Sequence, residues 1–134
     1  MRRLLFVILA FVLIASCKKD SPHTIAPDGI WEVGDVDFPP EYPGGQTAFF
    51  NFVGKNVRYP HDAVRNNIQG KVEVSFIVEL DGTLSNINAL THVGGGLEAE
   101  AVRAVGLSPK WKPGVKNNQP VRVRIQFPMN FSVH

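Results

Sequence analysis

The feature that most constrains this fold is the alternation of apolar and polar residues in two stretches, Lys71–Leu80, where Ile77 is the one apolar exception, and Val121–Val133. A period of two residues is typical of a β-strand that buries one face. The dipeptide Asp81-Gly82 follows the first stretch directly. It predicts a hairpin with a type I′ turn, because both central residues of that turn need a positive φ. The returning strand is then expected over residues 83–93.

Three short helices are expected around these strands, at residues 47–53, from Pro60 onwards, and at residues 97–107. Thr47 is the predicted cap of the first helix and Gly54 its end. Pro60 suits the first helical position of the second. The third helix is expected to bury Leu97, Ala101, Ala104 and Val105. The order helix, helix, strand, strand, helix, strand predicts an α+β domain, with a small antiparallel sheet of about three strands and helices packed on one face.

The first sixteen residues have the character of a signal peptide. Arg2 and Arg3 precede twelve consecutive apolar residues, whereas a membrane-spanning helix needs about 20. The sequence Ile14-Ala15-Ser16-Cys17 resembles a lipobox, with isoleucine where leucine is usual. We therefore predict lipidation at Cys17, the only cysteine of the chain. The alternative is a plain signal peptide that contains a cysteine.

Residues 17–45 are rich in proline and glycine, which predicts a tether without regular structure. Ile30, Trp31, Val33 and Val36 interrupt it and are candidates for packing onto the domain. The predicted organisation is a signal peptide at 1–16, an acidic tether at 17–45 and a domain at 46–134. Residues 42–134 hold ten basic and six acidic residues, an excess too small to indicate nucleic-acid binding.

Residue patterns typical of catalysis or metal binding are missing from the sequence. None of the four histidines has a second ligand at a recognisable spacing, and no nucleophile elbow is present. We expect a protein that is not an enzyme and that uses no metal and no cofactor.

A series of motifs in a fixed order resembles the TonB C-terminal domain family, the energy-transducer type. The series is Tyr59-Pro60, Ala63, Gly70, Val72-x-Val74-x-Phe76, Asp81-Gly82, Glu98, Ala101, Trp111-x-Pro113-Gly114, Pro120-Val121, Pro128 and Phe131. The preceding Tyr42-Pro43-Gly44-Gly45 is similar to the entry of family members of the Bacteroidetes type, here in a lipoprotein. The resemblance covers about residues 42–133.

The resemblance implies a periplasmic domain that binds the TonB box of outer-membrane receptors, in TonB-dependent transport, by adding the box as a strand to the edge of the last strand. The implied partner-binding residues are Arg58, Tyr59, Pro60, Val121, Arg122, Val123, Arg124, Ile125, Gln126 and Phe127. Physical reasoning agrees, because an exposed strand edge is a template for an incoming strand. Pro128 cannot donate to a β-ladder and predicts an edge strand or a bulge.

Structural alternatives to these roles stay open. Tyr59 could cap the core, Pro60 could start a helix, and Arg122 and Arg124 could pair with Glu73 across the strands. The alternative function is an envelope lipoprotein that uses the same fold as a protein-interaction module with no transport role. A homodimer through the open edge is a further alternative.

The expected location is the periplasmic face of a membrane, through the lipid on Cys17. By resemblance to lipoprotein sorting rules, Lys18 in place of aspartate favours the outer membrane. A lipid anchor cannot couple to a motor through membrane helices, so energy transduction is not implied by the domain alone.

Overall fold

The computed structural model describes residues 29–132. The predicted signal peptide, Cys17 and the first part of the tether, residues 17–28, lie outside the described residues. The elements in chain order are β1 (Ile30–Glu32), the 3-10 helix η2 (Val33–Asp35), α2 (Gln46–Asn56), α3 (His61–Arg65), β2 (Gly70–Val78), β3 (Leu84–Ala89), α4 (Leu97–Gly106), β4 (Gly114–Lys116) and β5 (Gln119–Phe131).

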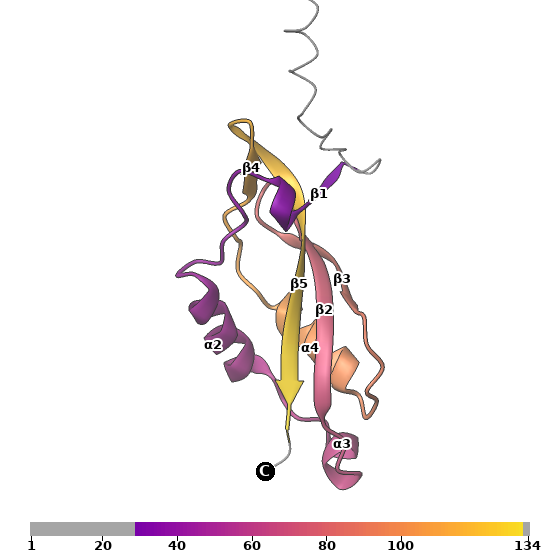
Figure 1. Ribbon diagram of the computed structural model, residues 1–134. Helices are drawn as coiled ribbons and strands as arrows, with labels where there is room; N and C mark the ends of the chain where they lie inside the picture. Colours follow the sequence, from indigo (N-terminus) through magenta and orange to yellow (C-terminus); the bar gives the residue numbers. More distant parts are fainter. Residues whose placement is uncertain (1–28, 133–134) are drawn as a thin grey trace, which may run out of the picture.

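The strands form one sheet in the order β1-β5-β2-β3, and β4 also pairs with β5 (Figure 1). Strand β2 is antiparallel to both β3 and β5, whereas β1 is parallel to β5. The predicted α+β class is confirmed. The prediction of about three antiparallel strands is wrong, because the sheet is mixed and has five strands. The two missed strands, β1 and β4, have three residues each, too few to show an alternating pattern.

The expectation of a tether without regular structure is wrong for residues 30–35. Strand β1 pairs with Arg122–Arg124 of β5, and η2 follows it directly. Ile30 is buried and Trp31 is half-buried, so the packing expected of these two residues is confirmed. Val33 is 42% exposed and does not join the core. The boundary between tether and domain at residue 45 stays a prediction.

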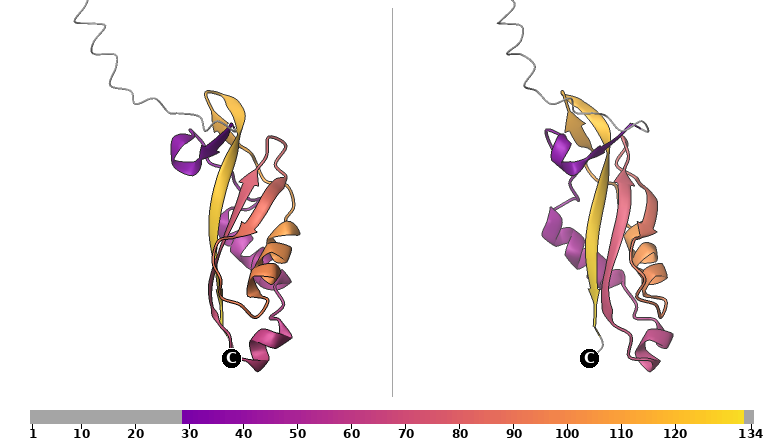
Figure 2. Two further views of the ribbon diagram at one scale, coloured as in Figure 1. Left: turned by 90° about the vertical axis from the view of Figure 1, so that its right-hand side faces the viewer. Right: turned by 45° about the vertical axis from the view of Figure 1, so that its right-hand side comes forward.

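The core lies on one face of the sheet, where α2 and α4 cover it (Figure 2). Val72, Val74, Phe76 and Val78 of β2 point into it and are fully buried. From α4, the four residues predicted from the sequence are buried, which confirms that stripe. An aromatic cluster of Tyr42, Phe49, Phe76 and Trp111 fills the end of the core beside the start of α2, with ring centroids 4.8 to 6.2 Å apart.

The predicted helix ends are wrong by a few residues. Helix α2 begins at Gln46, after Gly45 with φ 92°, and Thr47 is not its cap. It continues through Gly54 to Asn56. Pro60 precedes α3 with an extended ψ of 142° and is not its first helical residue. These ends depend on single backbone dihedrals, which a pattern of apolar residues does not specify.

The hairpin between β2 and β3 is present, but its turn differs from the prediction. Of the pair Asp81-Gly82 only Gly82 has a positive φ, of 88°. Its N–H donates to the Glu79 carbonyl at 2.9 Å, and the Glu79 N–H donates to the Thr83 carbonyl at 2.8 Å. This is a type I turn followed by a left-handed glycine, the three-residue hairpin loop.

Strand β3 contains a β-bulge that keeps its apolar side chains on one face of the sheet. The register with β2 shifts between Ser75 and Ile77, where Asn86 takes a φ of 50°. Before the bulge Leu84 packs on the core, and after it Ile87 and Ala89 do. The extra residue therefore keeps all three apolar side chains on the helix-covered face.

Candidate functional site

The predicted partner-binding residues lie at two ends of β5. The Tyr59 ring contacts the Phe131 ring, with centroids 5.9 Å apart, so Arg58–Pro60 lies by the last residues of β5. Arg122 is nine residues earlier on the same strand. At about 3.3 Å per residue, Arg122 lies roughly 30 Å from Phe131, whereas Phe127 lies about 13 Å from it. The predicted residues are therefore spread along β5 and do not form one cluster of side chains.

The residues at the first end are engaged within the protein. The Tyr59 hydroxyl donates to the Ile68 carbonyl at 2.5 Å, which agrees with the alternative that Tyr59 caps the core. The Arg58 backbone N–H donates to the Glu100 carboxylate at 2.5 Å. The hydrogen bond from Arg103 lowers the pKa of Glu100, which keeps this carboxylate charged.

The two arginines at the other end form ion pairs across neighbouring strands. Arg122 contacts Glu79 through two nitrogens, at 2.7 and 3.1 Å, and Arg124 contacts Glu32 of β1 at 2.5 Å. The Arg122 hydrogen bond, followed by that from Ser85, lowers the pKa of Glu79. The alternative that these arginines pair with Glu73 is wrong, because the register places Glu73 opposite Pro128.

One section of the outer edge of β5 carries no partner strand among residues 29–132. Strand β1 covers this edge at residues 122–124, and β4 pairs with residues 119–121 at the start of β5. Beyond Arg124, only β2 pairs with β5, on the opposite side. We call the section Ile125–Phe131 the open edge. Of the predicted strand residues, Ile125, Gln126 and Phe127 lie on the open edge, whereas residues 121–124 already have partner strands.

The direction of the backbone groups on the open edge follows from the register. The Glu73 carbonyl accepts the Leu90 N–H at 2.7 Å, and the Glu73 N–H donates to Thr91, so both groups point away from β5. Residues that face each other in an antiparallel pair share the same hydrogen-bonding state. Pro128, which faces Glu73, therefore directs its backbone outward.

Gln126 and Asn130 lie two residues to either side of Pro128 and also point outward, because the direction alternates along a strand. The open edge thus offers two N–H donors, from Gln126 and Asn130, and three carbonyl acceptors, from these residues and Pro128. Proline has no N–H, so the centre of the edge lacks one donor.

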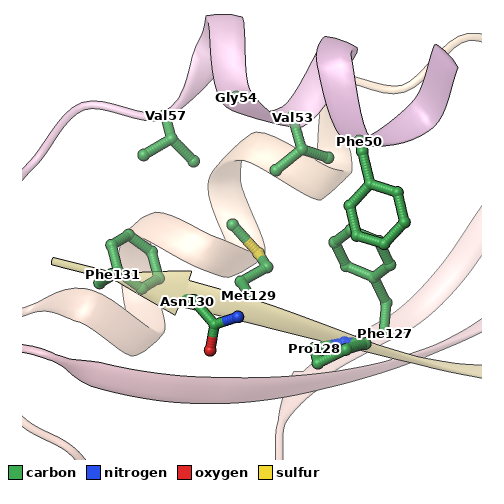
Figure 3. A pocket seen from close by; sticks show the side chains of 9 residues that line it. All are labelled: Phe50, Val53, Gly54, Val57, Phe127, Pro128, Met129, Asn130 and Phe131. Atoms are coloured by element: carbon green, nitrogen blue, oxygen red, sulfur yellow. The ribbon is translucent and has the colours of Figure 1, made fainter. Parts of the chain in front are cut away.

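A cavity of about 280 Å³ follows the second half of the open edge, between β5 and α2 (Figure 3). Phe50, Val53 and Gly54 of α2 and Val57 directly after it line one side, and residues 127–131 of β5 line the other. Five consecutive strand residues line the same cavity, although their side chains alternate between the two faces of the sheet. That combination arises only at a strand edge. We call this cavity the α2 groove.

A second cavity, of about 460 Å³, borders the first half of the open edge. Residues 125–128 line it together with Phe38, Pro40, Tyr42 and Trp111. Phe127 and Pro128 line both cavities, and the Phe127 ring lies 4.9 Å from that of Phe50. The two cavities therefore follow one another along the open edge, and both are mainly apolar.

Sequence reasoning missed the α2 side of this site. Pro128 predicts an edge strand or a bulge, and its outward backbone agrees with the first of these two interpretations. Phe50 and Val57 were not singled out, and Gly54 was noted only as the predicted end of a helix. The available signal was Phe50, an aromatic residue that lies off the stripe formed by Phe49 and Val53 and is 43% exposed.

Residues 29–132 offer neither a metal site nor a membrane-spanning helix. No group of three or more histidine, cysteine, aspartate or glutamate side chains is placed to hold a metal ion within this part of the chain. Within the same residues, no helix combines the length and apolar character needed to cross a membrane.

These features define a small α+β domain with an open strand edge between apolar cavities. Residues 55–133 match the family model of the Gram-negative bacterial TonB protein C-terminal domain. The chain belongs to this family, whose domains work in the cell envelope and generally contact outer-membrane transporters in TonB-dependent transport.

Two solved structures of the Helicobacter pylori TonB C-terminal domain are similar to this chain. One, of its residues 194–285, is 24% identical with a TM-score of 0.47, and covers 64% of this chain and 90% of that one. The other, of its residues 179–285, is 26% identical with a TM-score of 0.47, and covers 69% and 87%. No curated protein matches the chain.

Proposed function

We propose that this protein binds the TonB-box segment of outer-membrane transporters by adding it as a strand to β5 at Ile125–Phe131, as part of TonB-dependent transport. The observation that carries the proposal is the open edge, which has outward backbone groups and no partner strand among residues 29–132. Membership of the TonB C-terminal family supports the transport context. The domain would act by binding alone, without catalysis.

The chemistry of strand addition fits this edge. Backbone hydrogen bonds give affinity in such complexes, and pockets for alternate side chains give specificity. The open edge offers donors at Gln126 and Asn130, and its two cavities lie where alternate side chains of an added strand would point. The proposed pairing section begins after Arg124, because β1 already pairs with residues 122–124.

The test is an NMR titration of the protein with TonB-box peptides from transporters of the same cell. We expect the largest amide shifts over residues 125–131, above all at Gln126 and Asn130. A control peptide with proline at alternate positions lacks the N–H donors that face β5 and is expected to cause no such shifts. The absence of shifts at millimolar peptide would reject the proposal and favour an envelope interaction module with no transport role.

We further propose that Cys17 is acylated and holds the domain at a membrane, with the outer membrane favoured. The support is the positive start at Arg2 and Arg3, the apolar run after it and the lipobox-like residues 14–17. The mass of the protein purified from cells tests this directly. A chain that starts at an acylated Cys17 is expected, and a chain that keeps residues 1–16 would contradict it.

A further inference from the structure

We infer that the bound strand carries an apolar–polar–apolar triplet opposite Asn130, and that one of its apolar side chains fills a notch over Gly54 in the α2 groove. This inference rests on the proposed function and adds the side-chain chemistry of the partner. The notch is formed mainly by residues of α2 before residue 55, and the match to the family model begins at residue 55.

Helix α2 leaves an apolar side uncovered next to the open edge. Phe50 is 43% exposed and Val57 is half-buried, and in Figure 3 both point toward β5. Gly54 lies between them, and a Cβ atom built on it would meet no atom within 4 Å apart from its own helical turn. The notch over Gly54 is therefore open space bounded by apolar side chains.

The glycine at this position has no explanation inside the chain. Gly54 does not have a positive φ, so its backbone does not require glycine. In a helix interior, glycine is less favourable than alanine by about 1 kcal/mol. A residue that weakens its own helix and keeps a space empty beside an open strand edge points to an occupant from outside the chain.

The backbone directions of β5 set the register of that occupant. The partner residue directly opposite Asn130 in the added strand has its side chain on the same face as Asn130, away from the helices. The partner residues before and after it point to the other face, beside Met129 and Phe131 and beneath α2. This result is the same for a parallel and an antiparallel partner, since it depends only on alternation.

The lining decides which side chains these positions accept. The nine residues that line the α2 groove include no ionisable side chain. A charged side chain placed there would lose hydration without gaining a partner, whereas an apolar one would gain by burial. On the opposite face, the middle residue of the triplet lies next to the exposed amide side chain of Asn130 and is open to solvent, so it is expected to be polar.

The test uses two nine-residue peptides with blocked ends that differ only in the triplet, valine-threonine-valine or aspartate-threonine-aspartate, in a background of threonine and serine. Affinity is measured by NMR titration of the full protein, with the amides of Gln126 and Asn130 as reporters. We expect the apolar triplet to bind at least about ten-fold more tightly, the effect of burying aliphatic side chains.

Variants of α2 test the notch. Gly54→Leu fills it and is expected to weaken binding of the valine peptide about ten-fold or more. Asn51→Leu adds the same side chain at an exposed position of α2 outside the groove and is expected to leave binding unchanged. Gly54→Ala is expected to stabilise the protein and retain most of the affinity, which separates occlusion from misfolding.

The outcomes distinguish this inference from the proposed function. If peptides shift Gln126 and Asn130 but Gly54→Leu binds them as the unmodified protein does, the notch is refuted and strand addition stands. Equal losses in Gly54→Leu and Asn51→Leu would also refute the notch. If neither the valine peptide nor the transporter peptides bind, both proposals fail together.

Discussion

Substituting Pro128 by alanine tests the assignment of backbone directions on which both proposals depend. The register places Pro128 opposite Glu73, whose backbone groups point away from β5. The N–H created by Pro128→Ala should therefore point to solvent at the centre of the open edge. In the free protein it would have no strand to pair with.

The expected changes in stability and in peptide affinity follow from that geometry. The variant gains no internal hydrogen bond, and its unfolded chain becomes more flexible, so we expect the free energy of unfolding to fall by about 0.4–1 kcal/mol. On peptide binding, the new donor can complete the ladder at its centre. One added hydrogen bond contributes about 0.5–1.5 kcal/mol, which corresponds to roughly 2- to 10-fold tighter binding.

Hydrogen exchange measured residue by residue gives the assay. The new amide at position 128 should exchange rapidly in the free protein, whereas the amides of Phe127 and Met129, which point toward β2, should be protected. Peptide should slow exchange at position 128. Strong protection of this amide without peptide, together with an unchanged or increased stability, would show that it faces β2 and would refute the assignment.

Three further predictions concern stability. Gly82→Ala should destabilise the protein by at least about 2 kcal/mol in urea unfolding, because a Cβ at φ 88° would lie 2.0 Å from the Trp111 carbonyl oxygen. An unchanged unfolding midpoint would contradict this prediction. Leu97→Ala should lower the free energy of unfolding by about 2–5 kcal/mol, since the side chain is fully buried, and a loss below 1 kcal/mol would be inconsistent with that burial. The pKa of Glu79 is lowered from its ordinary value of 4.5, so the stabilisation that Glu79 provides is present above that pH and is lost as pH falls through the folded-state pKa. Glu79→Gln should therefore reduce the loss of stability below pH 4.5. Identical acid-unfolding profiles of the two proteins would count against a role for the Glu79–Arg122 pair.

Much of the fold could be predicted because its signals are local. The alternation in β2 and in β5, the glycine of the hairpin and the buried stripe of α4 each depend on residues close together in the chain. The class, the approximate position of these elements and the edge character of β5 followed from them. The type of the hairpin turn did not, because it depends on the dihedral angles of Asp81, which a dipeptide motif does not fix.

The candidate site could be predicted only in part. The sequence and the family resemblance predicted that the last strand is the binding edge, which stays a prediction, and Pro128 predicted an edge strand or a bulge. They also grouped Arg58–Pro60 with Val121–Phe127, although the structure separates the two groups along β5. Ion pairs with Glu79 and Glu32 now account for two of the residues selected as binding candidates.

The sequence by itself therefore determined that this chain forms an α+β domain with a hairpin and a long final strand, since these features depend on periodicity and on glycine within short stretches of neighbouring residues. The tertiary structure alone decided which part of that edge stays open. Strand β1 covers residues 122–124 from about ninety positions away in the chain, and α2 extends beside residues 127–131. Contacts between segments so distant in sequence leave no periodic signal in either one, so only the folded chain shows them.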